Sequence, residues 1–301
     1  MFKYSTRVLY YHVIADDLPA IYCQGITPRS FERQLALLWR LGWNFVSLSD
    51  AVRGSAGLPP KRVCLTLDDG FACNFDPLLK AIRKYGVKPT LFLVGKCLDN
   101  RALAWNHKLQ LINYHVPPSV LDDQVRQLTG EVGFAGLFRW LKMQDKDTLC
   151  DSLWDATMPF TQAEYLSQRK PFFSLSELKT LVAQGAELAL HSHSHPDFSR
   201  LTPEEAIGEL EANQAALEEA RLPYRKLFAY PYGRVATPQT EETLREQCQL
   251  EACLGTRFVS GDNLNPQARW QRQNMEHAVG RNYLEFFLYP HARKLKDRLL
   301  R

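Results

Sequence analysis

The chain has 301 residues, of which 45% are hydrophobic and 23% are charged, as in an ordinary globular protein and unlike a disordered one. Its formal net charge is only +4 and its basic residues are spread along the sequence, so we expect no nucleic-acid partner. No stretch approaches the roughly 18 consecutive apolar residues of a transmembrane helix, so we expect no integral membrane segment.

The first hundred residues alternate short apolar strands with amphipathic helices, the pattern of parallel strands with helices packed outside them. Thr27 followed by Pro28 predicts the start of a helix that stops at Gly42. A second helix is expected over residues 76–85. The expected strands cover residues 7–14, 45–48, 62–67 and 89–94.

The alternation breaks in the middle of the chain. Residues 97–173 are rich in Trp, His, Asp and Gln, with helical patches at 122–128 and 136–143. Because no linker-like composition flanks this segment, we interpret it as an insertion in one catalytic domain covering residues 1–301. Long insertions of this kind usually shape a binding site or an interface.

Regularity resumes at Ser174, which with Glu177 predicts a capping box at the start of a helix. The elements expected after it are strands at 187–190, 226–229, 250–254 and 269–275 and helices at 202–220, 238–247 and from 282 onward. Seven or eight strand–helix units favour an α/β barrel over an open sheet.

Two adjacent carboxylates, Asp68 and Asp69, follow the strand expected at 62–67. Neighbouring carboxylates repel each other unless a cation or a proton relieves the charge. A divalent metal bound by one of them leaves the other free to act as a general base. The alternative is a simple turn, because Asp-Gly is a common turn pair.

Three histidines, His191, His193 and His195, lie within five residues after the strand expected at 187–190. Imidazole is a standard ligand of zinc and related metals. A helix would bring His191 and His195 to one face, whereas an extended segment would align all three. The residues alone therefore predict a metal site without deciding which pair binds, and a His-rich polar loop is the alternative.

A third polar cluster, Tyr230 to Gly233, follows the strand expected at 226–229. It is either a turn after a buried strand or a turn that aims a backbone N–H at a developing oxyanion. In an α/β barrel the carboxyl ends of the strands meet at one mouth, where active sites are built. We therefore expect the three clusters to lie together.

Taken in order, the sequences TLDDG (66–70), HSHSHP (191–196) and YPYG (230–233) resemble the polysaccharide deacetylase family, also called carbohydrate esterase family 4 or the nodulation-type deacetylase homology domain. The resemblance covers roughly residues 7–280. It implies a distorted (β/α) barrel with fewer than eight regular units and, here, a long helical insertion. By the family pattern Asp69, His191 and His195 bind the metal, and Asp68 is the base that activates the attacking water.

The chain departs from the family pattern twice. Ala229 stands where the family usually has an arginine that holds the catalytic aspartate, and Arg272 resembles a later family arginine that could replace it. The C-terminal motif that normally supplies a general-acid histidine is also missing. The strand before His12 resembles the opening strand of permuted family members, which carry this final motif at the front of the chain. By this resemblance, His12 of the present chain would protonate the departing amine. A histidine held by a backbone carbonyl is the alternative for His12.

The resemblance predicts a metal-dependent hydrolase that removes the N-acetyl group from an amino sugar in a polysaccharide, oligosaccharide or glycan precursor. The expected cofactor is a divalent ion, most simply zinc, and the backbone N–H of Tyr232 is expected to stabilise the oxyanion. A metal-dependent amidase acting on a small non-carbohydrate amide is one alternative, since the motifs recognise only the acyl group and the metal. A catalytically inactive carbohydrate-binding homologue is another.

Two features bear on location. Residues 8–14 lack the apolar core and the cleavage site of a signal peptide, and the seven cysteines contain no CxxC pair, as expected for free thiols in a reducing compartment. We therefore expect a cytoplasmic protein acting on an intracellular glycan intermediate. The sequence does not indicate an oligomeric state.

Overall fold

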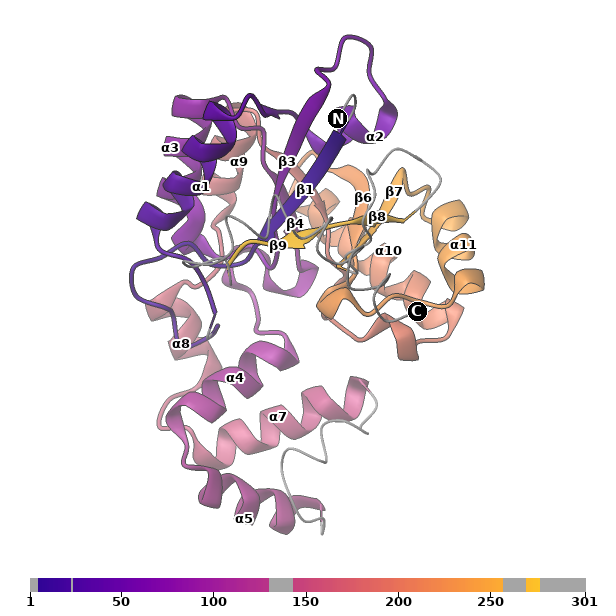
Figure 1. The fold of residues 1–301 in the computed structure, drawn as a ribbon. Helices are drawn as coiled ribbons and strands as arrows, with labels where there is room; N and C mark the ends of the chain where they lie inside the picture. The colour runs from indigo at the N-terminus through magenta and orange to yellow at the C-terminus, as the bar shows by residue number, and fades with distance from the viewer. Residues whose placement is uncertain (1–4, 23, 130–142, 257–268, 277–301) are drawn as a thin grey trace, which may run out of the picture.

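Parallel strands form the centre of the molecule, which the computed structural model describes over residues 5–22, 24–129, 143–256 and 269–276 (Figure 1). The order across the sheet is β8-β7-β6-β5-β4-β3-β1-β9, with β2 paired to β3 outside this path. The strands are β1 (Ser5–Tyr11), β2 (Asn44–Phe45), β3 (Lys61–Leu67), β4 (Thr90–Leu93), β5 (Glu187–Leu190), β6 (Arg225–Ala229), β7 (Ala252–Gly255), β8 (Trp270–Gln271) and β9 (Gln273–Asn274).

One short segment joins the two ends of this sheet. β8 pairs with β7 at Trp270, and β9, which begins two residues after the end of β8, pairs with β1 at Asn274. Arg272 lies between them and donates its backbone N–H to the carbonyl of Gly255 at 2.9 Å. Because the same segment bonds to both edge strands, the sheet curls into a distorted barrel. The predicted α/β barrel is confirmed.

Side chains along each strand alternate between the barrel interior and the surrounding helices, as the two-residue period of a strand requires. Leu9 and Leu65 join a buried cluster with helix residues such as Leu35. The residues one step earlier, Val8 and Cys64, belong to a separate cluster that fills the interior. Thr66 and Asp68 continue the inward-facing row of β3.

The outer layer consists of helices, and the sequence predicts the starts of all of them except α2. Thr27, Ser174 and Thr202 each accept a backbone N–H at a helix N-terminus, and the predicted capping box of Ser174 with Glu177 is present. These helices are α1 (Pro28–Arg40), α2 (Leu48–Arg53), α3 (Phe75–Tyr85), α9 (Leu175–Ala183), α10 (Pro203–Glu219) and α11 (Pro238–Gln247). Short 3-10 turns occur at Ala72–Asn74, Gly95–Asn100, Phe198–Arg200 and Pro231–Gly233.

Two strand predictions need correction. The first strand ends at Tyr11 rather than at residue 14, because the next backbone N–H groups bond to side chains and not to a strand: His12 and Val13 donate to Glu276. The strand expected at 45–48 ends at Phe45, since the Ser47 hydroxyl caps α2, a helix that the sequence analysis missed.

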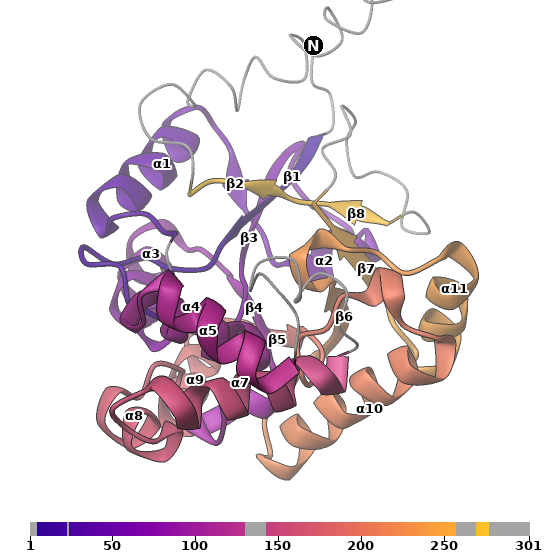
Figure 2. The same ribbon diagram turned by 90° about the horizontal axis from the view of Figure 1, so that it is seen from below.

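The expected insertion contains α4 (Trp105–His115), α5 (Pro118–Thr129), α7 (Met143–Thr157) and α8 (Gln162–Arg169). In Figures 1 and 2, α4, α5 and α7 gather below the barrel, on the side toward which β1 runs. The helical patch predicted at 122–128 lies within α5. Nearly all of the patch at 136–143, and the helix from 282, fall outside the described residues. None of the described helices is long and apolar enough to cross a membrane.

Candidate metal centre and active site

The polar clusters come from the carboxyl ends of neighbouring strands. Asp68 and Asp69 follow β3, His191 follows β5 and His12 follows β1. Because these strands are parallel and adjacent in the order β5-β4-β3-β1, their ends open on the same side of the barrel. The structure therefore brings together residues that are up to about 180 positions apart in the sequence.

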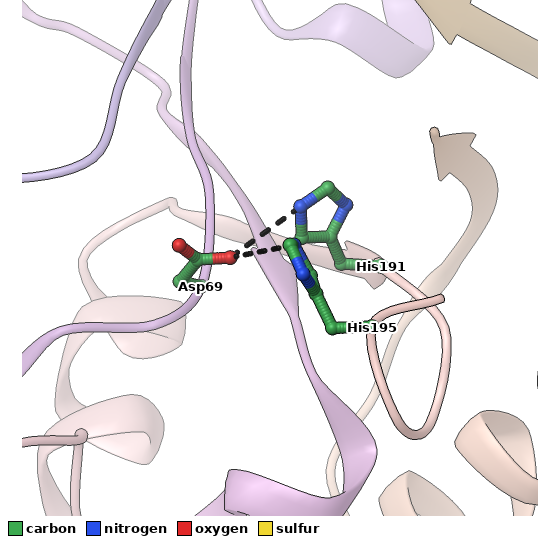
Figure 3. A group of neighbouring side chains, drawn as sticks. All are labelled: Asp69, His191 and His195. Carbon is green, nitrogen blue, oxygen red and sulfur yellow. Dashed lines mark ion pairs between the residues drawn. The ribbon is translucent and has the colours of Figure 1, made fainter. Parts of the chain in front are cut away.

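Asp69, His191 and His195 form a compact buried group (Figure 3). Asp69 Oδ1 lies 3.5 Å from His191 Nε2 and 3.3 Å from His195 Nε2. The three donor atoms all lie within 4.8 Å of one another, and each of the three residues is less than 5% exposed. Among the described residues, this is the one group of His, Cys, Asp or Glu that meets such a geometry, and His193 is not part of it.

The hydrogen bonds around this group fit a divalent cation. His191 Nδ1 lies 2.7 Å from the carbonyl oxygen of Ala229, so this nitrogen carries the proton and Nε2 presents a lone pair. Asp69 Oδ1 is buried and has no hydrogen-bond partner among the described residues. Two ligand atoms bound to a tetrahedral zinc at about 2.0–2.1 Å are roughly 3.3 Å apart, close to the observed separations.

The protonation states of Asp69 and His191 also fit a bound divalent cation. Burial on its own raises the pKa of Asp69, but His195 and other neighbouring imidazoles outweigh it and hold this pKa well below its usual range. Burial lowers the pKa of His191 to about 4, which keeps its imidazole neutral. An ionised carboxylate and a neutral imidazole are the forms that bind metal.

The loop that carries the histidines is shaped by α10. Ser192 and His195 adopt left-handed backbone conformations, with φ of 67° and 62°. The Glu209 carboxylate accepts the backbone N–H groups of His193 and Ser194 at 3.0 and 2.8 Å. These bonds offset the cost of the strained backbone and hold His191 and His195 on the same side.

Asp68 is paired with a buried guanidinium. Arg272 donates to both carboxylate oxygens, Nη1 to Oδ1 at 2.6 Å and Nη2 to Oδ2 at 2.8 Å, and is itself 2% exposed. The rings of Tyr10 and Phe92 lie 4.9 and 5.2 Å from the guanidinium carbon. Burial opposes ionisation of Asp68, but Arg272, then His191, reverse this effect and lower the pKa of Asp68. Arg272 thus reaches Asp68 although Ala229 cannot.

His12 is held by a residue that the sequence analysis did not select. His12 Nδ1 lies 2.8 Å from Glu276 Oε2, and the same carboxylate accepts the backbone N–H of His12. Burial lowers the pKa of His12, but Glu276 outweighs burial and raises it to about 8. His12 Nε2 lies 4.0 Å from Asp68 Oδ2, and Tyr22 stacks on the imidazole at 4.7 Å. The only sequence signal for Glu276 was its place directly after the last expected strand.

Tyr232 and Trp105 complete the surroundings of His195. Tyr232 adopts a positive φ of 56°, and its hydroxyl lies 2.8 Å from His195 Nδ1, a contact that the sequence did not suggest. Trp105, from the insertion, donates its indole N–H to the carbonyl of His195 at 3.1 Å. The sequence analysis assigned a role only to the backbone N–H of Tyr232. The structure adds a contact of its phenol with the candidate ligand His195.

Comparisons with known proteins identify similar structures and a matching family. A search of curated protein sequences finds no match. Among solved structures, IcaB from Ammonifex degensii is similar with a TM-score of 0.61 and 18% identity over 95% of this chain and 97% of that one. A de-N-acetylase from Aggregatibacter actinomycetemcomitans gives a TM-score of 0.61 and 15% identity over 94% and 99%. The deacetylase PplD from Streptococcus pyogenes, in complex with acetate, gives 0.57 and 16% over 90% and 92%.

These structural similarities, at low identity, establish the fold. The sequence itself matches the polysaccharide deacetylase family over residues 55–137 and 142–252, which include the aspartate pair, the histidine loop and the turn around Tyr232. The match covers well over half of the 301 residues. The chain belongs to the polysaccharide deacetylase family and is a sugar N-deacetylase.

Proposed function

We propose that this deacetylase depends on a divalent metal, most simply zinc, held by Asp69, His191 and His195. The observation that carries the proposal is the buried group in which two imidazole Nε2 atoms face the unpartnered Oδ1 of Asp69. A divalent cation in such a group supplies a Lewis acid that polarises an acyl oxygen and makes water more acidic.

Asp68 is the proposed general base. Its pairing with Arg272 keeps it ionised at neutral pH, so that it accepts a proton from water as the water attacks the acetamido carbonyl carbon. Arg272 positions the carboxylate rather than touching the substrate. Its bidentate contact fixes the direction in which the remaining lone pairs of Asp68 point.

His12 is the proposed general acid, as the resemblance of its strand to the permuted family members implies. With its pKa raised to about 8, the imidazole is protonated at neutral pH and donates from Nε2 to the amine nitrogen as the C–N bond breaks. The backbone N–H of Tyr232 donates to the developing oxyanion. Water thus adds to the carbonyl carbon, and acetate and a free amino sugar leave.

The proposed substrate is the N-acetyl group of an amino sugar in a polysaccharide, oligosaccharide or glycan precursor. PplD, which shares the fold, was solved with acetate, the acid that such a reaction releases. The Aggregatibacter protein is named a de-N-acetylase, which agrees with a reaction that removes an N-acetyl group.

Acetate release from a panel of N-acetylated sugars tests the proposal, with added zinc and with chelator. We expect release from at least one sugar class that chelator abolishes and zinc restores. Release that survives complete metal removal would refute the metal dependence. Release only from a small non-sugar amide would favour the amidase alternative, and metal binding without any turnover would favour a binding protein.

A further inference from the structure

A buried lysine of the insertion lies near the candidate metal centre and has no counter-ion among the residues that the structure describes. Lys146, on α7, is 8% exposed, and no hydrogen bond or ion pair joins its ammonium to the other residues that the structure describes. Its nitrogen is not sealed from solvent, so an ion can reach it. An ammonium that keeps only part of its hydration is stabilised when a negative group pairs with it.

The ammonium is placed by an aromatic ring of the same insertion. Lys146 Nζ lies 4.7 Å from the centroid of the Trp105 ring, within the range of a cation–π contact. Burial, then Arg200, lower the pKa of Lys146, while Asp197 acts in the opposite direction. A negative group beside this ammonium would offset both the loss of hydration and the repulsion by Arg200.

Two acidic residues of α7, Asp147 and Asp151, are already engaged by other lysines. Asp147 accepts from Lys96 at 2.5 Å and from Lys108 at 2.8 Å. Asp151 also accepts from Lys108. Neither of these two carboxylates is therefore paired with Lys146, so neither competes with a ligand for its ammonium.

Trp105 connects this lysine to the reaction centre. The indole N–H donates to the carbonyl of His195, and the indole ring lies 6.1 Å from the ring of Tyr232. One aromatic side chain thus separates the ammonium from a candidate metal ligand. An anion bound at Lys146 would therefore lie beside the same indole that contacts the loop of the proposed ligand His195.

We propose that Lys146, held by Trp105, is an anion-binding subsite that selects an N-acetylated sugar carrying a negative charge close to the acetamido group. This inference rests on the proposed function and adds the charge of the substrate to it. The chemistry fits a phosphate ester on the same sugar or the carboxylate of a neighbouring uronate. Both pair with an ammonium through charge-assisted hydrogen bonds.

Calorimetric binding to the zinc-loaded full-length protein tests the subsite without requiring turnover. N-acetylglucosamine 1-phosphate is compared with the neutral methyl glycoside of N-acetylglucosamine. A disaccharide of N-acetylglucosamine and glucuronate is compared with the neutral N-acetylglucosamine disaccharide. We expect one charged probe to bind about tenfold more tightly than its neutral counterpart, and the pair that shows the difference identifies the source of the charge.

Substitutions assign the effect to Lys146. Lys146→Met keeps the apolar stem and should remove the affinity advantage of the charged probe. Lys146→Arg keeps the positive charge and should preserve most of this advantage. Lys80→Met, on the exposed face of α3, is the control for the change in overall charge. Equal affinity of charged and neutral probes, or an advantage that survives Lys146→Met, would overturn the proposal. Acetate release is measured in parallel: its absence from every sugar would count against the proposed function, whereas the affinity ratios alone decide the subsite.

Discussion

At the scale of single residues, the pairing of Asp68 with Arg272 gives two neighbouring aspartates different surroundings, in line with the different roles proposed for them. Asp68 is bonded through both oxygens to a guanidinium, whereas Asp69 Oδ1 has no hydrogen-bond partner among the described residues. Adjacent carboxylates with different surroundings are a recurrent way to obtain one proton acceptor and one ligand from the same residue type. The environment, and not the residue type, distinguishes them.

The substitution Asp68→Asn should lower kcat/KM about 10²- to 10⁴-fold, the usual contribution of a general base, because an amide cannot accept the proton. Bound zinc, measured by elemental analysis, should stay at the wild-type level because Asp69, His191 and His195 are intact. Near-wild-type turnover by this variant would refute the role of Asp68.

The Glu276–His12 pair predicts the alkaline side of the pH profile. His12 donates a proton only while it is protonated, so kcat/KM should fall as the pH rises through about 8. Glu276→Gln removes the charge that raises this pKa and should move the fall toward lower pH. Glu187→Gln, a partly buried glutamate at the start of β5, should leave the profile in place. An unchanged profile in Glu276→Gln would exclude His12 as the titrating acid.

At the scale of secondary structure, α10 supports the histidine loop along one of its faces. Glu209 and Asn213, four residues apart, share a face of the helix. Asn213 accepts the backbone N–H of His191 at 3.0 Å and donates to the carbonyl of Leu93 at 3.2 Å. The helix therefore orients the candidate ligands without contributing one.

Glu209→Ala should weaken zinc binding about 10- to 100-fold, the usual cost of removing groups that orient metal ligands. The substitution leaves the backbone N–H groups of His193 and Ser194 without their acceptor. Competition with a chromophoric chelator measures the affinity. Glu211→Ala, at an exposed position of the same helix, is the matched control. Equal affinities for the two variants would show that the loop keeps its shape without Glu209.

At the scale of the whole molecule, the candidate site joins parts of the barrel that lie far apart in the sequence. Asp69 follows β3, the two histidines follow β5, and Arg272 lies in the segment that bonds to both edge strands. An ion bound only by the folded arrangement stabilises that arrangement.

Saturating zinc should therefore raise the melting temperature of the metal-free protein. At a free concentration 100 times Kd, the free energy of unfolding should increase by about 2.7 kcal/mol, which corresponds to a shift of several degrees. Differential scanning fluorimetry measures the shift. His195→Ala, which removes one proposed ligand, should lose most of it, and an equal shift in this variant would place the zinc elsewhere.

The sequence by itself determined the order of the main barrel strands, most of the helices between them and the candidate metal ligands. Capping residues such as Thr27 and Ser174, and the period of apolar side chains, are local signals, and the helices they predict are present. The clusters that contain Asp68, Asp69, His191 and His195 were likewise readable, because their place after strands is a local property, and the resemblance to the family selected the ligands among them.

Only the tertiary structure decided which distant residues complete the site. Arg272 could be suggested from the sequence, but its contact with Asp68 depends on how the barrel closes. Glu276, Glu209 and Lys146 carried no recognisable pattern, since a single charged residue at the end of a strand or on a helix is ordinary. Their partners, His12, the histidine loop and Trp105, are set by packing between segments that the local signals do not relate.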